Sequence, residues 1–203
     1  MKNDGRQGMK LGITGGIGSG KTSVCRVFGV LGIPVFSADP EAQAIMNHDE
    51  SIIRGINGIA GKDLYSEGRL DKEELAILIF NDPAKLSKVN SLVHPVVFQH
   101  FKKWAEMQTT PYVIMEAAIL FESGASSLVD RVATVIAPIE ERISRVIQGN
   151  KLSREQVMDR IRNQMDDEAR IKMSDYIINN SENEMIIPVI LGIHEDILNH
   201  LNS

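Results

Sequence analysis

The chain has 203 residues, 43% of them hydrophobic, which suffices to bury one core, so we expect one domain with insertions. The formal net charge of −5 excludes an overall field that attracts nucleic acid, and any anion site must be local. A single cysteine, Cys25, excludes an internal disulfide framework, and no apolar run approaches the ~20 residues of a membrane span, so we expect a cytoplasmic protein without a membrane partner.

The chain opens with a polar segment, residues 1–8, that we expect to be a disordered leader. A strand over residues 10–14 and a helix over 21–31 follow, joined by a glycine-rich loop. From Gly15 to Thr22 this loop fits the pattern G-x-x-x-x-G-K-[ST], which is typical of a phosphate-binding loop between a strand and a helix.

Each part of the loop has a chemical purpose. Glycines let the backbone approach a ligand, and successive N–H groups then form an anion nest at the positive end of a helix. Lys21 would reach the β- and γ-phosphates, and the Thr22 hydroxyl would bind Mg²⁺. The pattern predicts a nucleoside triphosphate site. Its expected contacts are Gly15, Gly16, Ile17, Gly18, Ser19, Gly20, Lys21, Thr22 and Ser23.

Asp39 follows the second predicted strand, residues 33–37. Ligands of open α/β sheets gather at the carboxyl ends of the strands, so Asp39 could accept a proton from an attacking hydroxyl. It could equally be the N-cap of a helix that starts at Pro40. The pattern leaves both roles open.

A helical block lies between the second and third strands. Helices are predicted over residues 51–60, 71–80, from 83, and over 96–107, with a turn-rich link at 61–68 and an interruption at His94-Pro95. We interpret the block as an insertion beside the sheet, where a second substrate would bind. A lone histidine such as His94 is more often structural, and no second ligand stands at zinc spacing.

Carboxylates follow the third strand, predicted over residues 111–115. Glu116 stands directly after it, where phosphate-loop enzymes place an acid that holds Mg²⁺ through water, although an ordinary strand-end carboxylate is the alternative. Glu122 has weaker support from the pattern alone. A fourth buried strand is predicted over residues 131–136.

Arginine-bearing helices follow the fourth strand and could form a lid over the phosphates. They are predicted over residues 138–148, 153–165 and 167–173, and they carry Arg142, Arg145, Arg160 and Arg162. The planar arginine side chain suits phosphate, but interspersed acids favour a solvated salt-bridge surface for most of these residues. Arg145 is our candidate contact. A strand at 176–179 and a helix at 188–201 complete an α/β pattern of five strands.

Several segments together resemble the dephospho-CoA kinase family over residues 9–201. These are the loop segment 11–22, Ser37-Ala-Asp39, and the segments 68–71, 79–82, 90–95, 119–122, 152–156, 160–164 and 175–180. The resemblance implies a P-loop kinase-type parallel sheet with a helical substrate-binding insertion and a helical lid. Its nucleotide-binding core would comprise residues 9–39, 111–139 and 174–203, with the CoA-binding insertion at 40–110 and the lid at 140–173.

The resemblance also implies a reaction. ATP, with Mg²⁺, would phosphorylate the ribose 3′-hydroxyl of dephospho-CoA, giving coenzyme A and ADP in the last step of coenzyme A biosynthesis. Asp39 would be the acceptor-side base, acting with Lys21 and Arg145. Asp39, His94, Glu116 and Glu122 would contact the substrates, with Thr22 and Glu116 at the metal.

Four positions depart from the family pattern. Ser37 replaces the first Asp of an Asp-Ala-Asp element, Glu116 stands where Asp is usual, and Ala118 where Pro is usual. Gly149 replaces a lid arginine, a loss for which Arg142 or Lys151 could compensate.

Two other interpretations remain. A nucleoside or nucleotide kinase of the same fold is close in chemistry, but the helical insertion after Asp39 favours dephospho-CoA. A non-catalytic GTP switch would need Asn-Lys-x-Asp, and residues 150–153 lack that Asp. We expect a monomer or weak homo-oligomer without a nucleic-acid partner.

Overall fold

The computed structural model describes residues 8–80, 82–149 and 152–203. The chain divides into two compact units, which we call the sheet unit (Met1–Ser37 and Trp104–Ser203) and the helical unit (Ala38–Lys103). The predicted leader, apart from Gly8, and Lys151 lie outside the described residues.

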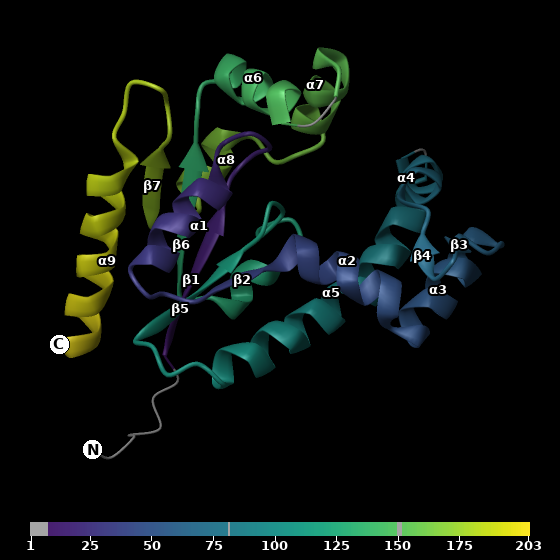
Figure 1. The fold of residues 1–203 in the computed structure, drawn as a ribbon, viewed down its shortest axis with the longest axis horizontal. Coiled ribbons are helices and arrows are strands. Elements are labelled where there is room, and N and C mark those ends of the chain that lie inside the picture. Colours follow the sequence, from purple (N-terminus) through teal and green to yellow (C-terminus); the bar gives the residue numbers. More distant parts are fainter. Residues whose placement is uncertain (1–7, 81, 150–151) are drawn as a thin grey trace. The chain divides into compact units, whose positions relative to one another are not determined.

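The sheet unit is built on a parallel sheet, which confirms the predicted fold class (Figure 1). Among the described residues it has five strands in the order β2-β5-β1-β6-β7, and every neighbouring pair is parallel. The strands are β1 (Met9–Thr14), β2 (Val35–Ser37), β5 (Tyr112–Glu116), β6 (Arg131–Ile136) and β7 (Tyr176–Asn179). Each lies within two residues of its predicted bounds, because continuous apolar runs are typical of buried parallel strands.

One face of the sheet is covered by α1 (Lys21–Val30) and α9 (Ile186–Asn202). Alternate residues of β1, Leu11 and Ile13, are fully buried and pack in one cluster with Phe28 of α1 and Ile190 of α9. Each such side chain contributes about 1.5–3 kcal/mol when buried. The core thus fixes α1, and with it the loop before α1, on β1.

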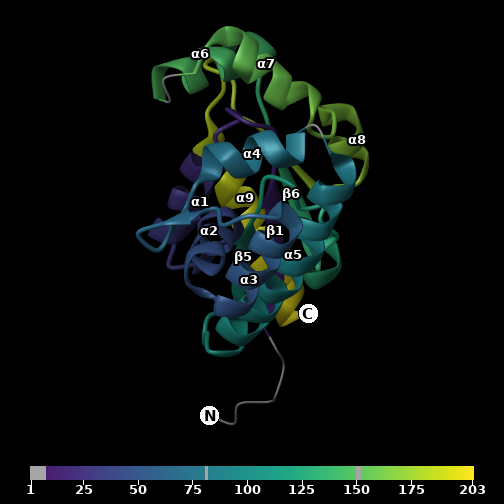
Figure 2. The ribbon, with the colours of Figure 1, turned by 90° about the vertical axis from the view of Figure 1, so that its right-hand side faces the viewer.

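Short helices follow β5 and β6. The 3₁₀ helix η1 (Ala125–Leu128) lies between these strands, and α6 (Ile139–Gly149), α7 (Arg154–Arg162) and α8 (Asp167–Lys172) lie between β6 and β7. Figures 1 and 2 show α6 and α7 beyond the carboxyl ends of β6 and β7. The predicted capping box of α7 is present: Ser153 and Gln156 each bond the other's backbone amide. The three helices predicted between β6 and β7 are therefore present.

The helical unit contains α2 (Ala38–His48), α3 (Glu50–Ala60), α4 (Lys72–Phe80) and most of α5 (Pro83–Glu106). It also contains a hairpin, β3 (Tyr65–Ser66) with β4 (Arg69–Leu70), in the segment expected to be a turn-rich link. Its turn residues, Glu67 and Gly68, have φ of 51° and 74°. Positive φ at both positions is typical of the tight turns that match strand twist.

Two predicted helix bounds in this unit are wrong. α2 begins at Ala38, so Asp39 lies inside its first turn and is not its N-cap. α5 continues through Pro95 without a break at His94. An internal proline costs about 3 kcal/mol. The continuous apolar stripe of α5 offsets this cost, because burial of each such side chain contributes about 1.5–3 kcal/mol. The stripe comprises Val89, Val93, Val97 and Phe101, each at most 5% exposed.

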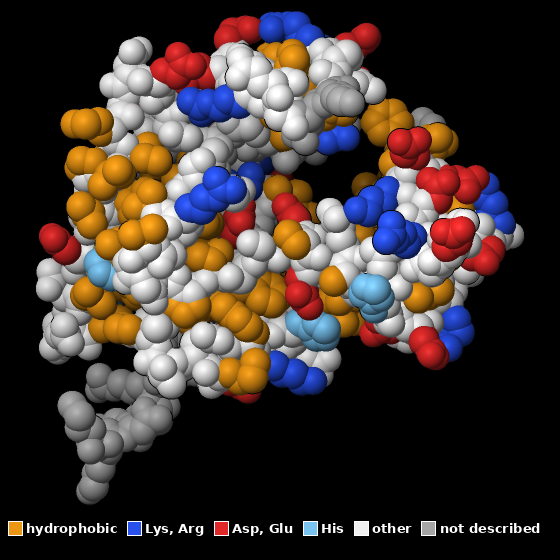
Figure 3. All heavy atoms as spheres, in the orientation of Figure 1, with side chains coloured by type: hydrophobic (Ala, Val, Ile, Leu, Met, Phe, Trp, Pro, Cys, Tyr) orange, Lys and Arg blue, Asp and Glu red, His pale blue; other side chains and the backbone are white. Residues whose placement is uncertain are grey.

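The first turns of α9 expose apolar side chains. Figure 3 shows hydrophobic side chains gathered over this helix, at the left of the view. The exposed residues at its start are Met185, Ile187, Val189 and Leu191. Across the part of the chain that the structure describes, no helix is both long enough and apolar enough to span a membrane.

Candidate functional site

The phosphate loop connects β1 to α1, as predicted. Gly20 precedes α1 with φ of 95°, and a Cβ there would lie 2.0 Å from Nδ2 of Asn180. Asn180, just beyond β7, donates from Nδ2 to the Ser19 carbonyl oxygen (2.8 Å). The end of a distant strand therefore holds the loop, and its backbone can approach so closely only at a glycine.

Lys21 is folded back along the loop. Its ammonium Nζ donates to the carbonyl oxygen of Gly15 (2.8 Å) and approaches that of Gly16 (3.5 Å). The charge is thus oriented by backbone dipoles before any phosphate binds, which lowers the reorganisation needed at reaction. Ser23 is exposed on the first turn of α1.

Cys25 is packed in the core behind the loop and is 5% exposed. Burial, reinforced by the negative charge of Glu116, raises the pKa of its thiol. A thiol that keeps its proton is a poor nucleophile. Cys25 is therefore a core residue, as expected.

Oxygen atoms that could coordinate a cation lie together beside the loop, at the ends of β2 and β5. Oε1 of Glu116 accepts a hydrogen bond from Thr22 Oγ1 (3.2 Å), and Oε2 accepts one from Ser37 Oγ (3.0 Å). A hydroxyl and a carboxylate are ligands that suit Mg²⁺, which also binds substrate phosphates. Among the described residues, no group of three or more His, Cys, Asp or Glu side chains could hold a metal. The donor set fits a cation that the nucleotide helps to bind.

The Ser37 hydroxyl orients the Glu116 carboxylate. We expect Ser37→Ala to raise the Mg²⁺ concentration for half-maximal activity about 2–10-fold, because one hydrogen bond to the carboxylate is lost. A magnesium titration of initial rates measures this. Ser127→Ala is the matched control, since that exposed hydroxyl bonds only the Gly124 carbonyl among its described contacts. An unchanged magnesium requirement in Ser37→Ala would contradict this role.

Arg145 carries a donor without a protein partner among the described residues. Its Nη2 donates to Glu141 (2.9 Å), whereas its Nη1 is buried and makes no hydrogen bond. An unsatisfied buried donor costs about 1–3 kcal/mol, so a ligand anion at this atom would be stabilising. Arg145 therefore has the chemistry predicted for a phosphate contact.

The other predicted lid arginines differ from Arg145. Arg162 is exposed and pairs with Asp159 (3.1 Å), and Arg160 is exposed. This agrees with a solvated salt-bridge surface. Arg142 is 5% exposed and donates to the Ile17 carbonyl oxygen and to a carboxylate, so its fork binds protein groups.

Glu122 belongs to an ion-pair network around the buried Arg170. Its Oε1 accepts from the Met165 backbone N–H (3.1 Å) and lies 3.4 Å from Nη2 of Arg170. Arg170 is 1% exposed and also donates to Asp167 (3.0 Å). Sequence reasoning missed Arg170, because it lies among acids on a short helix and no local pattern shows that it is buried.

Two predicted substrate residues lie in the helical unit. Asp39 stands two residues beyond Ser37, in the first turn of α2. His94 is half-buried on α5 and stacks on Phe98, with ring centroids 6.0 Å apart. Burial lowers the pKa of His94, which favours a neutral imidazole at neutral pH.

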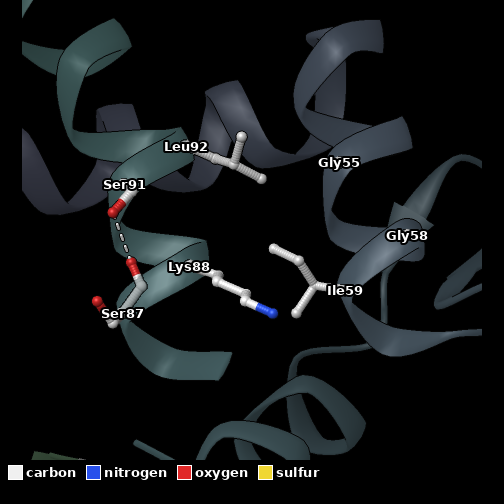
Figure 4. A pocket seen from close by; sticks show the side chains of 7 residues that line it. All are labelled: Gly55, Gly58, Ile59, Ser87, Lys88, Ser91 and Leu92. Carbon is white, nitrogen blue, oxygen red and sulfur yellow. Dashed lines mark hydrogen bonds between the residues drawn. The ribbon is translucent and has the colours of Figure 1, made fainter. Parts of the chain in front are cut away.

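The helical unit contains a cavity of about 480 Å³ between α3 and α5 (Figure 4). Gly55 and Gly58 leave room on the α3 side, and Ile59 and Leu92 provide apolar contacts. The Lys88 side chain extends into the space from α5, and two serine hydroxyls lie beside it. This mixture suits a ligand with both apolar and anionic parts.

Three features together define a P-loop kinase: a phosphate loop with an oriented lysine, an acid on the neighbouring strand, and arginine-bearing helices after β6. The family model for dephospho-CoA kinase matches residues 9–185 of this chain. The chain belongs to the dephospho-CoA kinase family, a family of phosphotransferases.

Individual relatives agree with this assignment. The dephospho-CoA kinase of Bacteroides fragilis (strain YCH46) is 39% identical over 184 residues, which cover 90% of each chain. A crystal structure from Thermus thermophilus superposes with a TM-score of 0.83 at 30% identity, covering 98% of this chain and 100% of the other. The dephospho-CoA kinase of Campylobacter jejuni shares the fold, with a TM-score of 0.68 at 23% identity, covering 93% and 96% of the two chains.

Proposed function

We propose that this protein transfers the γ-phosphoryl group of ATP to the ribose 3′-hydroxyl of dephospho-CoA, giving coenzyme A and ADP. The observation that carries the proposal is the oriented phosphate site, with Lys21 on the loop carbonyls and Thr22 on Glu116, in a chain of this family. The reaction would take place in the cytoplasm.

The donor half of the site would bind and polarise the triphosphate. Loop amides and the Lys21 ammonium would take the β- and γ-phosphates, and the buried Nη1 of Arg145 would take charge that develops on the moving group. Thr22 and Glu116 would hold Mg²⁺, which neutralises charge on the β- and γ-oxygens when bound.

The acceptor half would come from the helical unit. Asp39 would accept the proton of the 3′-hydroxyl as that oxygen attacks phosphorus. His94 and the cavity beside Lys88 would contact the rest of dephospho-CoA, whose pyrophosphate and pantetheine arm are anionic and partly apolar. Glu122 would act indirectly, since its carboxylate already binds Arg170 and the Met165 amide.

The choice of acceptor is the decisive test of this function. A coupled ADP-release assay with ATP and Mg²⁺ should give turnover with dephospho-CoA, with kcat/KM at least about 100-fold above that for adenosine or AMP. Mass spectrometry should find one phosphoryl group added at the ribose 3′ position. Turnover with adenosine but none with dephospho-CoA would overturn the proposal in favour of a nucleoside kinase.

A further inference from the structure

Two side chains of the lid segment hydrogen-bond the backbone of Ile17 in the phosphate loop, one at its N–H and one at its carbonyl oxygen. Its amide N–H donates to Oε1 of Gln164 (2.8 Å), and its carbonyl oxygen accepts from Nε of Arg142 (2.9 Å). Arg142 lies on α6, and Gln164 stands just after α7. The two partners are 125 and 147 residues away in sequence.

The side chain of Ile17 also packs against the lid helices. It packs against the small apolar core formed by Ile143, Val146 and Val157, which are 1%, 4% and 0% exposed. This core lies between α6 and α7 and is separate from the main core under the sheet. Backbone and side chain of Ile17 therefore connect the loop to the lid together.

An ion pair with Asp167 also holds the Arg142 guanidinium in this position. Its Nη1 donates to one oxygen of Asp167 (2.9 Å), whose other oxygen accepts from Arg170 (3.0 Å). Arg142 thus donates in two directions at once, to the loop and to the carboxylate. The planar arginine fork permits this, and the single ammonium of lysine does not reproduce the geometry.

The loop and Arg142 approach so closely that two glycines are required. A Cβ on Gly16 would lie 2.0 Å from Nη2 of Arg142. A Cβ on Gly18, where φ is 75°, would lie 2.4 Å from the Arg142 carbonyl oxygen. The loop backbone and Arg142 are therefore in close contact at both glycines.

We propose that Ile17 is the joint between lid and phosphate loop, and that Gln164 and Arg142 are positioning residues for phosphoryl transfer. Neither needs to touch substrate. They hold the loop amides in the arrangement that binds the β-phosphate, and they transmit lid movement to the loop. This proposal rests on the proposed function for its consequence in catalysis, but nucleotide binding tests it separately.

The first test replaces Gln164 with methionine, which keeps the length of the side chain and removes the acceptor. We expect the Kd for ADP, measured by calorimetry, and the KM for ATP each to rise about tenfold. The KM for dephospho-CoA should change less than about twofold. Gln148→Met is the matched control, since Nε2 of that exposed glutamine bonds Ser144 within its own helix.

Amide exchange separates positioning from a loss of stability. In Gln164→Met, the Ile17 amide should exchange at least about tenfold faster by NMR, while core amides such as Ile114 keep their rates. Faster exchange at Ile17 with unchanged ADP affinity would overturn the proposal, because the hydrogen bond would then be structural only. Unchanged exchange at Ile17 would overturn it as well.

The second test uses Arg142→Lys, which keeps the charge and loses the fork. We expect a similar loss of ADP affinity. The double variant with Gln164→Met should lose less ADP affinity than the product of the two single fold-changes, since both side chains act through Ile17. Arg162→Lys, on the exposed face of α7, is the control. Full ADP affinity in Arg142→Lys would contradict the proposal. A wild-type protein that binds ADP but does not phosphorylate dephospho-CoA would contradict the proposed function alone.

Discussion

Replacing Asp39 with asparagine is expected to lower kcat with dephospho-CoA about 10²–10⁴-fold, the usual contribution of a positioned general base. Asparagine keeps the size of the side chain but cannot accept the proton of the attacking hydroxyl. The Kd for ATP should stay within about twofold, because the triphosphate would bind to the loop and Lys21. Initial rates and calorimetric ATP titrations of the same preparation measure the two effects.

Glu41→Gln is the matched control for Asp39→Asn. Glu41 lies in the same first turn of α2 and pairs with His100 (2.6 Å), so its replacement removes the same charge from the same helix end. We expect this variant to keep kcat within about threefold, as exposed ion pairs contribute little. If Asp39→Asn retained near wild-type kcat, another group would have to accept the proton.

Replacing Lys21 with alanine is expected to lower kcat/KM by at least about 10³-fold, since one oriented cation near the moving phosphoryl group typically contributes that much. The assay with ATP and dephospho-CoA measures it. Lys172→Ala, an exposed lysine at the end of α8, should leave kcat/KM unchanged. Near wild-type activity in Lys21→Ala would show that this loop is not the catalytic phosphate site.

Thermal unfolding separates the Lys21 effect from misfolding. The Lys21 ammonium contacts loop carbonyls rather than the core, and it is only half-buried. We therefore expect the Tm of Lys21→Ala to lie within a few degrees of the wild-type value. A large drop in Tm would mean that the loop depends on this charge for its conformation.

The elements with strong local signals were predictable. The phosphate loop from Gly15 to Thr22 matches a short local pattern, and the structure places the loop between β1 and α1. The five strands are continuous apolar runs, and Ser153 with Gln156 forms the predicted capping box. In each case the sequence signal lies within a few consecutive residues.

Two predictions in the helical unit applied local rules that the structure does not follow. Pro95 predicts a helix end, yet the apolar stripe from Val89 to Phe101 keeps α5 continuous. Asp39 has the chemistry of an N-cap, yet α2 begins at Ala38, two residues before the predicted start at Pro40. The helix propensity of a single residue contributes at most about 3 kcal/mol to stability, and burial of the whole apolar face of α5 contributes more.

The roles of the lid arginines were not open to sequence reasoning. Arg142 and Arg145 stand one helical turn apart on α6 with similar neighbours, but Arg142 binds Ile17 and Asp167 while Arg145 keeps a buried donor unpaired by protein. Arg142 is occupied by partners more than 20 residues away in sequence, whereas Nη1 of Arg145 has no described protein partner and could bind a phosphate. Local pattern established the loop and the strands of the sheet. Only the tertiary structure decided which charges around them bind protein groups, because those contacts join residues that are distant in the chain.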